Sequence, residues 1–112
     1  MNFNKETIEG LRGIKITVEK DSKIVGRVYL YLINNDLHEK AYGVLEDLYV
    51  DEEYRNKGIG QQLVEAVIAE AKKQNCYKLI SQSRYSRLNV HNFYKKNGFK
   101  DYGKNFRMDL LE

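Results

Sequence analysis

Hydrophobic residues alternate with polar ones early in the chain, as they do in half-buried strands. Ile14, Ile16 and Val18 alternate with charged or hydroxyl side chains, which predicts one strand. Residues 23–33 are rich in β-branched and aromatic side chains and predict a second strand, with Gly26 as a candidate bulge. The short polar link between the two strands favours an antiparallel hairpin.

A longer-period pattern begins after residue 60. Residues 41–50 predict a third strand, and over residues 60–74 the apolar side chains then recur at helical spacing, with Asn75 expected to end the helix. Residues 77–83 predict a fourth strand. A strand, a helix and a strand of one sheet imply a parallel pair joined by a right-handed crossover.

The two ends of the chain predict shorter elements. Residues 7–11 could hold one helical turn, and residues 87–97 predict a second helix with Gly98 just beyond its C-terminal end. Residues 99–102 predict a short strand. Residues 104–110 alternate apolar and polar side chains, which predicts a final strand.

Together these elements predict an α/β (α+β) fold that forms one domain over residues 1–112. Its sheet is expected to be single, mixed and mostly antiparallel, with a central parallel β-α-β unit. A length of 112 residues suits one domain with a modest core. The hydrophobic fraction of 42% and the nine tyrosines are typical of a globular chain.

Charge and composition exclude several classes of protein. The net charge of +3 is too small to predict a nucleic-acid partner. No apolar run approaches the roughly 20 residues of a membrane span, and the N-terminus has no apolar signal region. The one cysteine, Cys76, suits a reducing cytoplasm and is expected to be a small core-edge residue. No cluster of side chains has metal-ligand spacing.

The loop before the first long helix has the composition of an anion site. It holds Arg55, Asn56, Lys57, Gly58, Ile59 and Gly60. Backbone N–H groups at a helix start have no intrahelical partner, and the helix dipole places partial positive charge there. Glycine lets an anion approach the main chain, and the basic residues add charge. The plainer alternative is a glycine-rich turn that merely begins a helix.

Spacing excludes two common phosphate-binding motifs. Gln61 follows Gly60 where a P-loop would have lysine, and Leu63 occupies the third glycine position of a dinucleotide fingerprint. What remains is R-x-x-G-x-G, preceded by LEDLYV at residues 45–50 and followed by FYKKNGF at residues 93–99. In this order the three segments resemble the GNAT superfamily of N-acetyltransferases.

This resemblance implies a function and a set of binding residues. The chain would be an N-acetyltransferase that moves an acetyl group from acetyl-CoA to a primary amine, by direct attack through a tetrahedral intermediate. The strands at residues 41–50 and 77–83 would splay apart, and the main chain of Leu48, Tyr49 and Val50 would bind the pantetheine arm. The pyrophosphate would lie on the loop; the residues implied there are Arg55, Asn56, Lys57, Gly58, Ile59, Gly60 and Gln61.

The resemblance also suggests the groups that move protons. Tyr94 matches the tyrosine of the family's x-x-Y-x-x-x-G-F segment, which is often the general acid; packing of its ring is the alternative. Glu46 matches a glutamate of spermidine/spermine N-acetyltransferases and is the candidate base; the alternatives are recognition of substrate charge or an ion pair at the edge of the strand. Strand alternation would place Glu46 with Val44, Leu48 and Val50, where apolar neighbours would raise its pKa. The Val50 N–H is the candidate oxyanion donor.

Two departures from the family pattern shape the remaining expectations. The asparagine that often contacts the cofactor arm is replaced by Arg87, which leaves Asn89 as the nearest candidate. Family members usually begin with one more strand and two helices that roof the acceptor site, whereas only about a dozen residues precede the first strand here. Either a homodimer partner completes the site or a large substrate brings its own surface, and we expect the homodimer. A catalytically weak acyl-CoA-binding module or sensor is the main alternative. A small RNA-binding protein ranks lower because the chain lacks an RNP-type strand motif.

Overall fold

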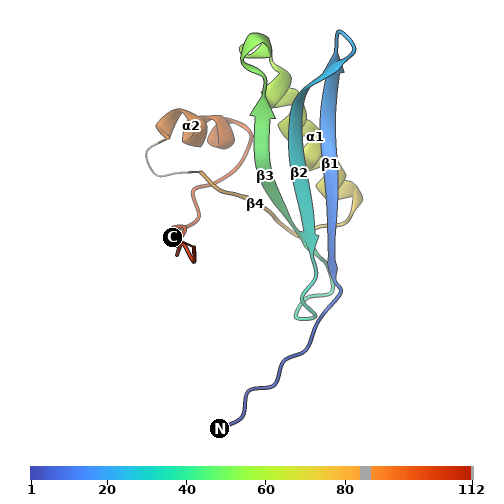
Figure 1. The fold of residues 1–112 in the computed structure, drawn as a ribbon, viewed down its shortest axis with the longest axis vertical. Helices are drawn as coiled ribbons and strands as arrows, with labels where there is room; N and C mark the ends of the chain where they lie inside the picture. The colour runs from blue at the N-terminus through green and yellow to red at the C-terminus, as the bar shows by residue number, and fades with distance from the viewer. Residues whose placement is uncertain (84–86, 112) are drawn as a thin grey trace. The chain divides into compact units, whose positions relative to one another are not determined.

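The computed structural model describes residues 1–83 and 87–111 and forms two compact units, Met1–Ser81 and Gln82–Glu112, which are described separately. The first unit contains β1 (Leu11–Lys20), β2 (Lys23–Ile33), β3 (Tyr42–Val50), the 3₁₀ helix η1 (Glu52–Tyr54), α1 (Ile59–Lys73) and β4 (Leu79–Ser81). The second unit contains α2 (Leu88–Lys96). Figure 1 shows these elements.

The first unit is a four-stranded mixed sheet with one helix packed on it. The strand order is β1-β2-β3-β4, with antiparallel pairing from β1 to β3 and parallel pairing of β3 with β4. Helix α1 connects the parallel strands and packs against β2 and β3 (Figure 1). The predicted mixed, mostly antiparallel sheet is therefore confirmed, and the parallel pair lies at one end of the described sheet.

One face of the sheet and one stripe of α1 form the core. Val28 and Leu30 of β2 are fully buried, and Leu63, Val64 and Val67 of α1 are at most 1% exposed. Burying a side chain of this size contributes about 1.5–3 kcal/mol to folding. The heptad-like spacing of the α1 residues explains why this stripe faces the sheet.

Two irregularities interrupt the antiparallel ladders. The register of β1 against β2 shifts between Val18 and Glu19, so that Val25 is the extra residue beside Gly26, where a bulge was predicted. A second shift between β2 and β3 places Arg27 opposite Tyr49 but Tyr29 opposite Glu46. Asp47, with φ 53°, lies in this second bulge, which the sequence analysis did not predict.

Three terminal predictions are wrong. The chain is irregular over residues 1–10, so no helical turn forms at residues 7–11, and Leu11 begins β1. Residues 99–102 and 104–110 form no strand, and Phe106, Met108 and Leu110 are 80–89% exposed. A strand needs a partner for its backbone groups, and no described segment pairs with either stretch.

The remaining predicted elements differ from the structure only in their limits. Strand β4 is shorter than residues 77–83, although the Tyr77 N–H still donates to the Ala41 carbonyl at 3.0 Å. Helix α1 begins one residue earlier than expected, at Ile59. No helix in the described part of the chain is both long and apolar enough to cross a bilayer.

Candidate functional site

The loop between η1 and α1 presents an uncapped helix N-terminus. Asn56 (φ 64°) and Gly58 (φ 85°) both adopt the left-handed conformation, which turns the chain sharply into α1. The N-cap residue of α1 is Gly58, and no side chain caps the helix there. The side chain of Ile59 is 2% exposed and anchors this end of the helix in the core. Backbone N–H groups of the first turn are therefore presented at a fixed place with the dipole behind them.

Gly60 leaves space above the first turn of α1. A Cβ atom built there would meet only the Val50 Cγ2 atom, at 4.0 Å. Its φ angle is not in the left-handed region, so nothing within the protein demands glycine at this position. The missing side chain instead keeps the main chain accessible to an external group.

The two basic side chains of the loop are held by aromatic rings. The Arg55 Nε–H donates to the Val50 carbonyl at 2.7 Å, and its guanidinium lies 5.2 Å from the centre of the Tyr49 ring. Arg27 of β2 lies 4.9 Å from the same ring. Two guanidinium groups therefore lie over the Tyr49 ring, near the end of β3.

Tyr54 holds a second pair of cations. The ammonium groups of Lys57 and Lys23 lie 5.4 Å and 5.2 Å from the centre of its ring. Its hydroxyl donates to Asp21 Oδ2 at 3.0 Å, and this hydrogen bond is the main reason why the pKa of Tyr54 is raised. This hydrogen bond links the β1–β2 turn, through Asp21, to Tyr54 in the segment that leads into the loop.

Among the described residues, nothing pairs with the outer edge of β3 over its second half. Pairing with β4 covers Gly43 to Leu45 on β3, and it ends where Leu45 faces Ser81. The Asp51 N–H donates to the Val25 carbonyl at 2.8 Å. Because backbone groups alternate in direction along an antiparallel ladder, the Val50 N–H points away from β2, toward this edge. The predicted parting of the two strands therefore matches the short ladder.

A buried serine lies where the β3–β4 ladder stops. The Oγ atom of Ser81 is buried and has no hydrogen-bond partner among residues 1–83 and 87–111. Burying a hydroxyl without a partner is unfavourable, so such groups usually have a ligand or water to bond. Ser81 is thus a further polar group at the proposed place of the pantetheine arm.

The bulge at Asp47 corrects the predicted surroundings of Glu46. Register places Glu46 beside Tyr29 and, across β2, on the same side as Lys15. This side lies opposite the fully buried Val28 and Leu30, which pack toward α1. The extra residue shifts Leu48 and Val50 to the α1 side, so the prediction that they share a face with Glu46 is wrong.

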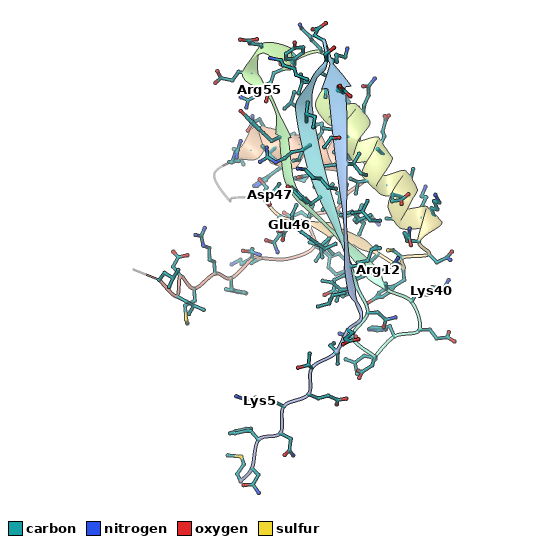
Figure 2. The ribbon with its side chains drawn as sticks, turned by 45° about the vertical axis from the view of Figure 1, so that its right-hand side comes forward. Lys5, Arg12, Lys40, Glu46, Asp47 and Arg55 are labelled. Atoms are coloured by element: carbon teal, nitrogen blue, oxygen red, sulfur yellow. The ribbon has the colours of Figure 1, made fainter. Side chains whose placement is uncertain are left out.

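Glu46 is also not enclosed by apolar groups. Its side chain is exposed, as is that of Asp47, and Figure 2 shows the two next to each other along β3. Arg55 lies further along, near the start of α1 (Figure 2). An exposed carboxylate can meet a cationic substrate directly or through water.

Tyr94 and Asn89 belong to the second unit. Asn89 is exposed near the start of α2, and Tyr94 is half-buried. The N–H groups of Gly98 and Phe99 donate to the carbonyls of Lys95 and Tyr94, each at 3.0 Å, which is a Schellman cap. The rings of Tyr94 and Phe99 pack edge to face with centres 5.3 Å apart.

This cap gives the Tyr-x-x-x-Gly-Phe spacing a structural cause. Gly98, with φ 95°, occupies the left-handed position that was predicted for it, and the Tyr94–Phe99 contact is the apolar pair that usually accompanies such a cap. The spacing alone therefore does not assign a chemical role to the Tyr94 hydroxyl. That role stays a prediction from the family resemblance.

The donors present fit a diphosphate ester better than a metal ion. Backbone N–H groups at Ile59 and Gly60, with Arg55 and Lys57 nearby, suit a doubly charged phosphate chain. The Gln61 side chain donates to Glu65 Oε1 at 3.0 Å, so only its backbone stays a candidate. The described residues hold no group of three His, Cys, Asp or Glu side chains placed to bind a metal.

Cys76 has no place in this arrangement. It is half-buried and free, and burial raises the pKa of its thiol while Arg12 partly opposes that shift. A thiol with a raised pKa is a poor nucleophile at neutral pH, which agrees with a packing role.

Sequence reasoning missed three contributors to the site. Arg27 lies over the Tyr49 ring, and Tyr54 donates to Asp21, through contacts between segments far apart in the sequence. Ser81 lies at the end of a ladder whose length cannot be read from the sequence pattern. A basic residue on the strand paired with LEDLYV was the one available signal for Arg27.

Comparison with known proteins gives a consistent result. The family model for acetyltransferases of the GNAT family matches residues 4–99. Glucosamine 6-phosphate N-acetyltransferase of Trypanosoma brucei brucei is 35% identical over 71 residues, which are 63% of this chain and 46% of that protein. N-acetyltransferase 8 of Homo sapiens is 30% identical over 88 residues, 79% of this chain and 39% of that protein. The chain thus spans less than half the length of these two relatives.

A solved structure agrees with the fold. The crystal structure of a Trypanosoma brucei acetyltransferase superposes with a TM-score of 0.75 at 29% identity, and the match covers 90% of this chain and 70% of that one. The family model spans most of the chain, and the uncapped loop lies inside the matched region. The chain therefore belongs to the GNAT family of acetyltransferases.

Proposed function

We propose that this protein is an acetyl-CoA-dependent N-acetyltransferase acting on a primary amine. The uncapped N-terminus of α1, with Gly60 open above it and the unpaired edge of β3 beside it, carries the proposal. The loop residues Arg55 to Gln61 would hold the pyrophosphate of acetyl-CoA. Leu48, Tyr49, Val50 and Ser81 of the strand edge would hold its pantetheine arm, with Asn89 as a further contact. When bound, acetyl-CoA supplies an acetyl group activated as a thioester.

The protein's own groups would manage protons and charge. Glu46, directly or through water, accepts a proton from the substrate ammonium so that the neutral amine can attack the carbonyl carbon. The Val50 N–H stabilises the carbonyl oxygen as it becomes negative. The carbon–sulfur bond then breaks, Tyr94 gives its proton to the departing thiolate, and the new amide nitrogen loses its second proton to solvent. Glu46 then gives up its proton to solvent and Tyr94 regains one, so that the overall reaction releases one proton with the amide and free coenzyme A.

Two measurements test the proposal together. Calorimetry should show binding of acetyl-CoA to the full chain, and release of free thiol should follow the addition of an amine. Binding without thiol release from any amine of a broad panel would favour the binding-module alternative. Absence of acetyl-CoA binding would overturn the proposal altogether.

Replacing Glu46 by glutamine should reduce kcat/KM about tenfold, a modest effect because bulk water can take over part of the proton transfer. The pH profile is the decisive measurement. The dependence of kcat/KM on pH should differ between the wild type and Glu46→Gln, because only the wild type has a carboxylate there to take the proton from the ammonium group. Asp47→Asn, which changes the neighbouring exposed carboxylate, is the matched control. An unaltered profile in Glu46→Gln would place the base elsewhere.

We further propose that the protein works as a cytoplasmic homodimer. Strand β1 is a ten-residue edge strand, and an exposed sheet edge favours pairing with another chain. Sedimentation equilibrium at assay concentration should give twice the chain mass. A monomeric mass in the active preparation would contradict this part of the proposal.

The names of relatives suggest acceptors to include in the panel. Glucosamine 6-phosphate is the substrate that the name of the Trypanosoma brucei brucei relative contains. Polyamines are a second class, since LEDLYV resembles the corresponding strand of spermidine/spermine N-acetyltransferases. Both belong in the assay beside simple alkyl and aryl amines.

A further inference from the structure

The side of the sheet opposite α1 contains a hollow of about 420 Å³. It lies entirely within the first unit, over the start of β1, the end of β2 and the first half of β3. Gly13 creates part of this space, because a Cβ atom there would lie 3.3 Å from the Tyr31 ring. A volume of this size suits a small organic molecule.

The wall of the hollow is apolar, with a carboxylate at one end. Leu11, Tyr31 and Val44 line it, and the side chains of Leu11 and Tyr31 are 57% and 36% exposed. Glu46 lines the end that lies on β3. From Glu46 the chain continues directly into Leu48–Val50, the stretch proposed to bind the thioester arm. An ammonium group at Glu46 would therefore lie on the same strand as the stretch proposed to hold the reacting carbonyl.

Among the described residues, the one cation that lines the hollow already has a hydrogen-bond partner. The Arg12 guanidinium donates to Gln74 Oε1 at 3.0 Å, just after the end of α1. Lys15 lies on the same side of the sheet as Glu46, but its ammonium group lies 5.5 Å from the centre of the Tyr29 ring and does not line the hollow. Among the described residues, the lining therefore offers an anionic end and an apolar wall, and its one cation, Arg12, is bonded to Gln74.

From this arrangement we infer that the acceptor is a primary amine joined to an apolar body, such as an arylalkylamine, and not a phosphorylated amino sugar. The inference rests on the proposed function and names its substrate class. Glu46 pairs with the ammonium group, and the body packs on Tyr31, Val44 and Leu11. The ligand is chosen because its charge complements Glu46 at one end of the hollow and its body can contact the Tyr31 ring at the other.

Thiol release with acetyl-CoA should distinguish the two acceptor classes. We expect kcat/KM for phenethylamine to exceed that for glucosamine 6-phosphate by about tenfold or more, since the one cation of the described lining, Arg12, is bonded to Gln74 and a phosphate gains nothing from the apolar wall. Equal or better turnover of glucosamine 6-phosphate would overturn the inference.

Variants at Tyr31 test where the body binds. Tyr31→Ser should raise the KM for phenethylamine about tenfold with little change in the KM for acetyl-CoA, whereas Tyr31→Phe should behave like the wild type. Tyr77→Ser is the matched control, because Tyr77 is similarly exposed at 42% but does not line the hollow. An unchanged KM for phenethylamine in Tyr31→Ser would refute the assignment.

Ligand-observed NMR with phenethylamine separates this inference from the proposed function. Saturation transfer from the wild-type chain, lost in Tyr31→Ser, would support the hollow as an amine site even if no acetyl group were transferred. If acetyl-CoA bound and amines were acetylated but phenethylamine gave no such signal, the transferase proposal would stand and the inference would fail.

Discussion

Replacing Gly60 by alanine is expected to stabilise the fold and impair the enzyme. Alanine is a better helix residue than glycine by about 0.5–1 kcal/mol, and the new methyl group would meet only Val50 Cγ2 at 4.0 Å. The same methyl group would occupy the space through which a phosphate reaches the main chain. Losing one charged hydrogen bond costs about 1.5–3 kcal/mol, so we expect a rise of about a hundredfold in the KM for acetyl-CoA.

A misfolded variant would lose both stability and acetyl-CoA binding, whereas Gly60→Ala is expected to keep or gain stability while it loses binding. Thermal unfolding should show an equal or higher Tm for Gly60→Ala, and calorimetry should show weaker binding of acetyl-CoA. Gly58→Ala is the informative control, because φ 85° at residue 58 disfavours any side chain and should lower stability by about 1–2 kcal/mol. If Gly60→Ala bound acetyl-CoA as tightly as the wild type, the proposal that the pyrophosphate binds at the N-terminus of α1 would be wrong.

The strands and helices of the middle of the chain were predictable because local pattern and tertiary packing agree there. In α1 the apolar positions recur with the helix period and all meet one sheet face, so the sequence period and the buried stripe coincide. The loop of Arg55 to Gly60 was predictable for the same kind of reason. Gly58 occupies a left-handed position and Gly60 a position with open space beside it, and glycine is the residue type expected at both.

The bulge at Asp47 could not be predicted from alternation. A period of two assumes an unbroken ladder, and one inserted residue reverses the face of everything that follows. Aspartate tolerates positive φ better than most residues, so Asp47 was the available signal, but such residues also occur in ordinary strands and turns. The consequence is large, because the neighbours of Glu46 depend on it.

The residues after α2 show the opposite limitation. Phe106, Met108 and Leu110 alternate as a strand would, yet alternation describes a suitable surface and supplies no partner. The contacts of Arg27 with Tyr49, and of Tyr54 with Asp21, likewise depend on which segments meet in three dimensions. Local structure that depends on one contiguous segment was therefore easier to predict than contacts between several segments.

Replacing Tyr94 by phenylalanine should lower kcat for acetyl transfer about a hundredfold and leave the KM for acetyl-CoA unchanged. The variant keeps the ring that packs on Phe99 at 5.3 Å and the Schellman cap below it, and it removes only the hydroxyl. A positioned general acid contributes about a hundredfold or more, because a thiolate leaves more readily when it gains a proton. Tyr102→Phe is the matched control in the same unit, since Tyr102 is 97% exposed.

The two explanations of the Tyr94 motif give different results in this experiment. If the Tyr-x-x-x-Gly-Phe spacing serves only the helix cap, Tyr94→Phe keeps full turnover, and a packing-disrupting change such as Phe99→Ala lowers stability without a specific effect on kcat. If the hydroxyl is the acid, Tyr94→Phe loses turnover at unchanged Tm, and the loss should shrink with an acyl donor whose thiol has a lower pKa. A leaving group that is already stable as an anion gains less from a proton, so this dependence would assign the proton to the sulfur.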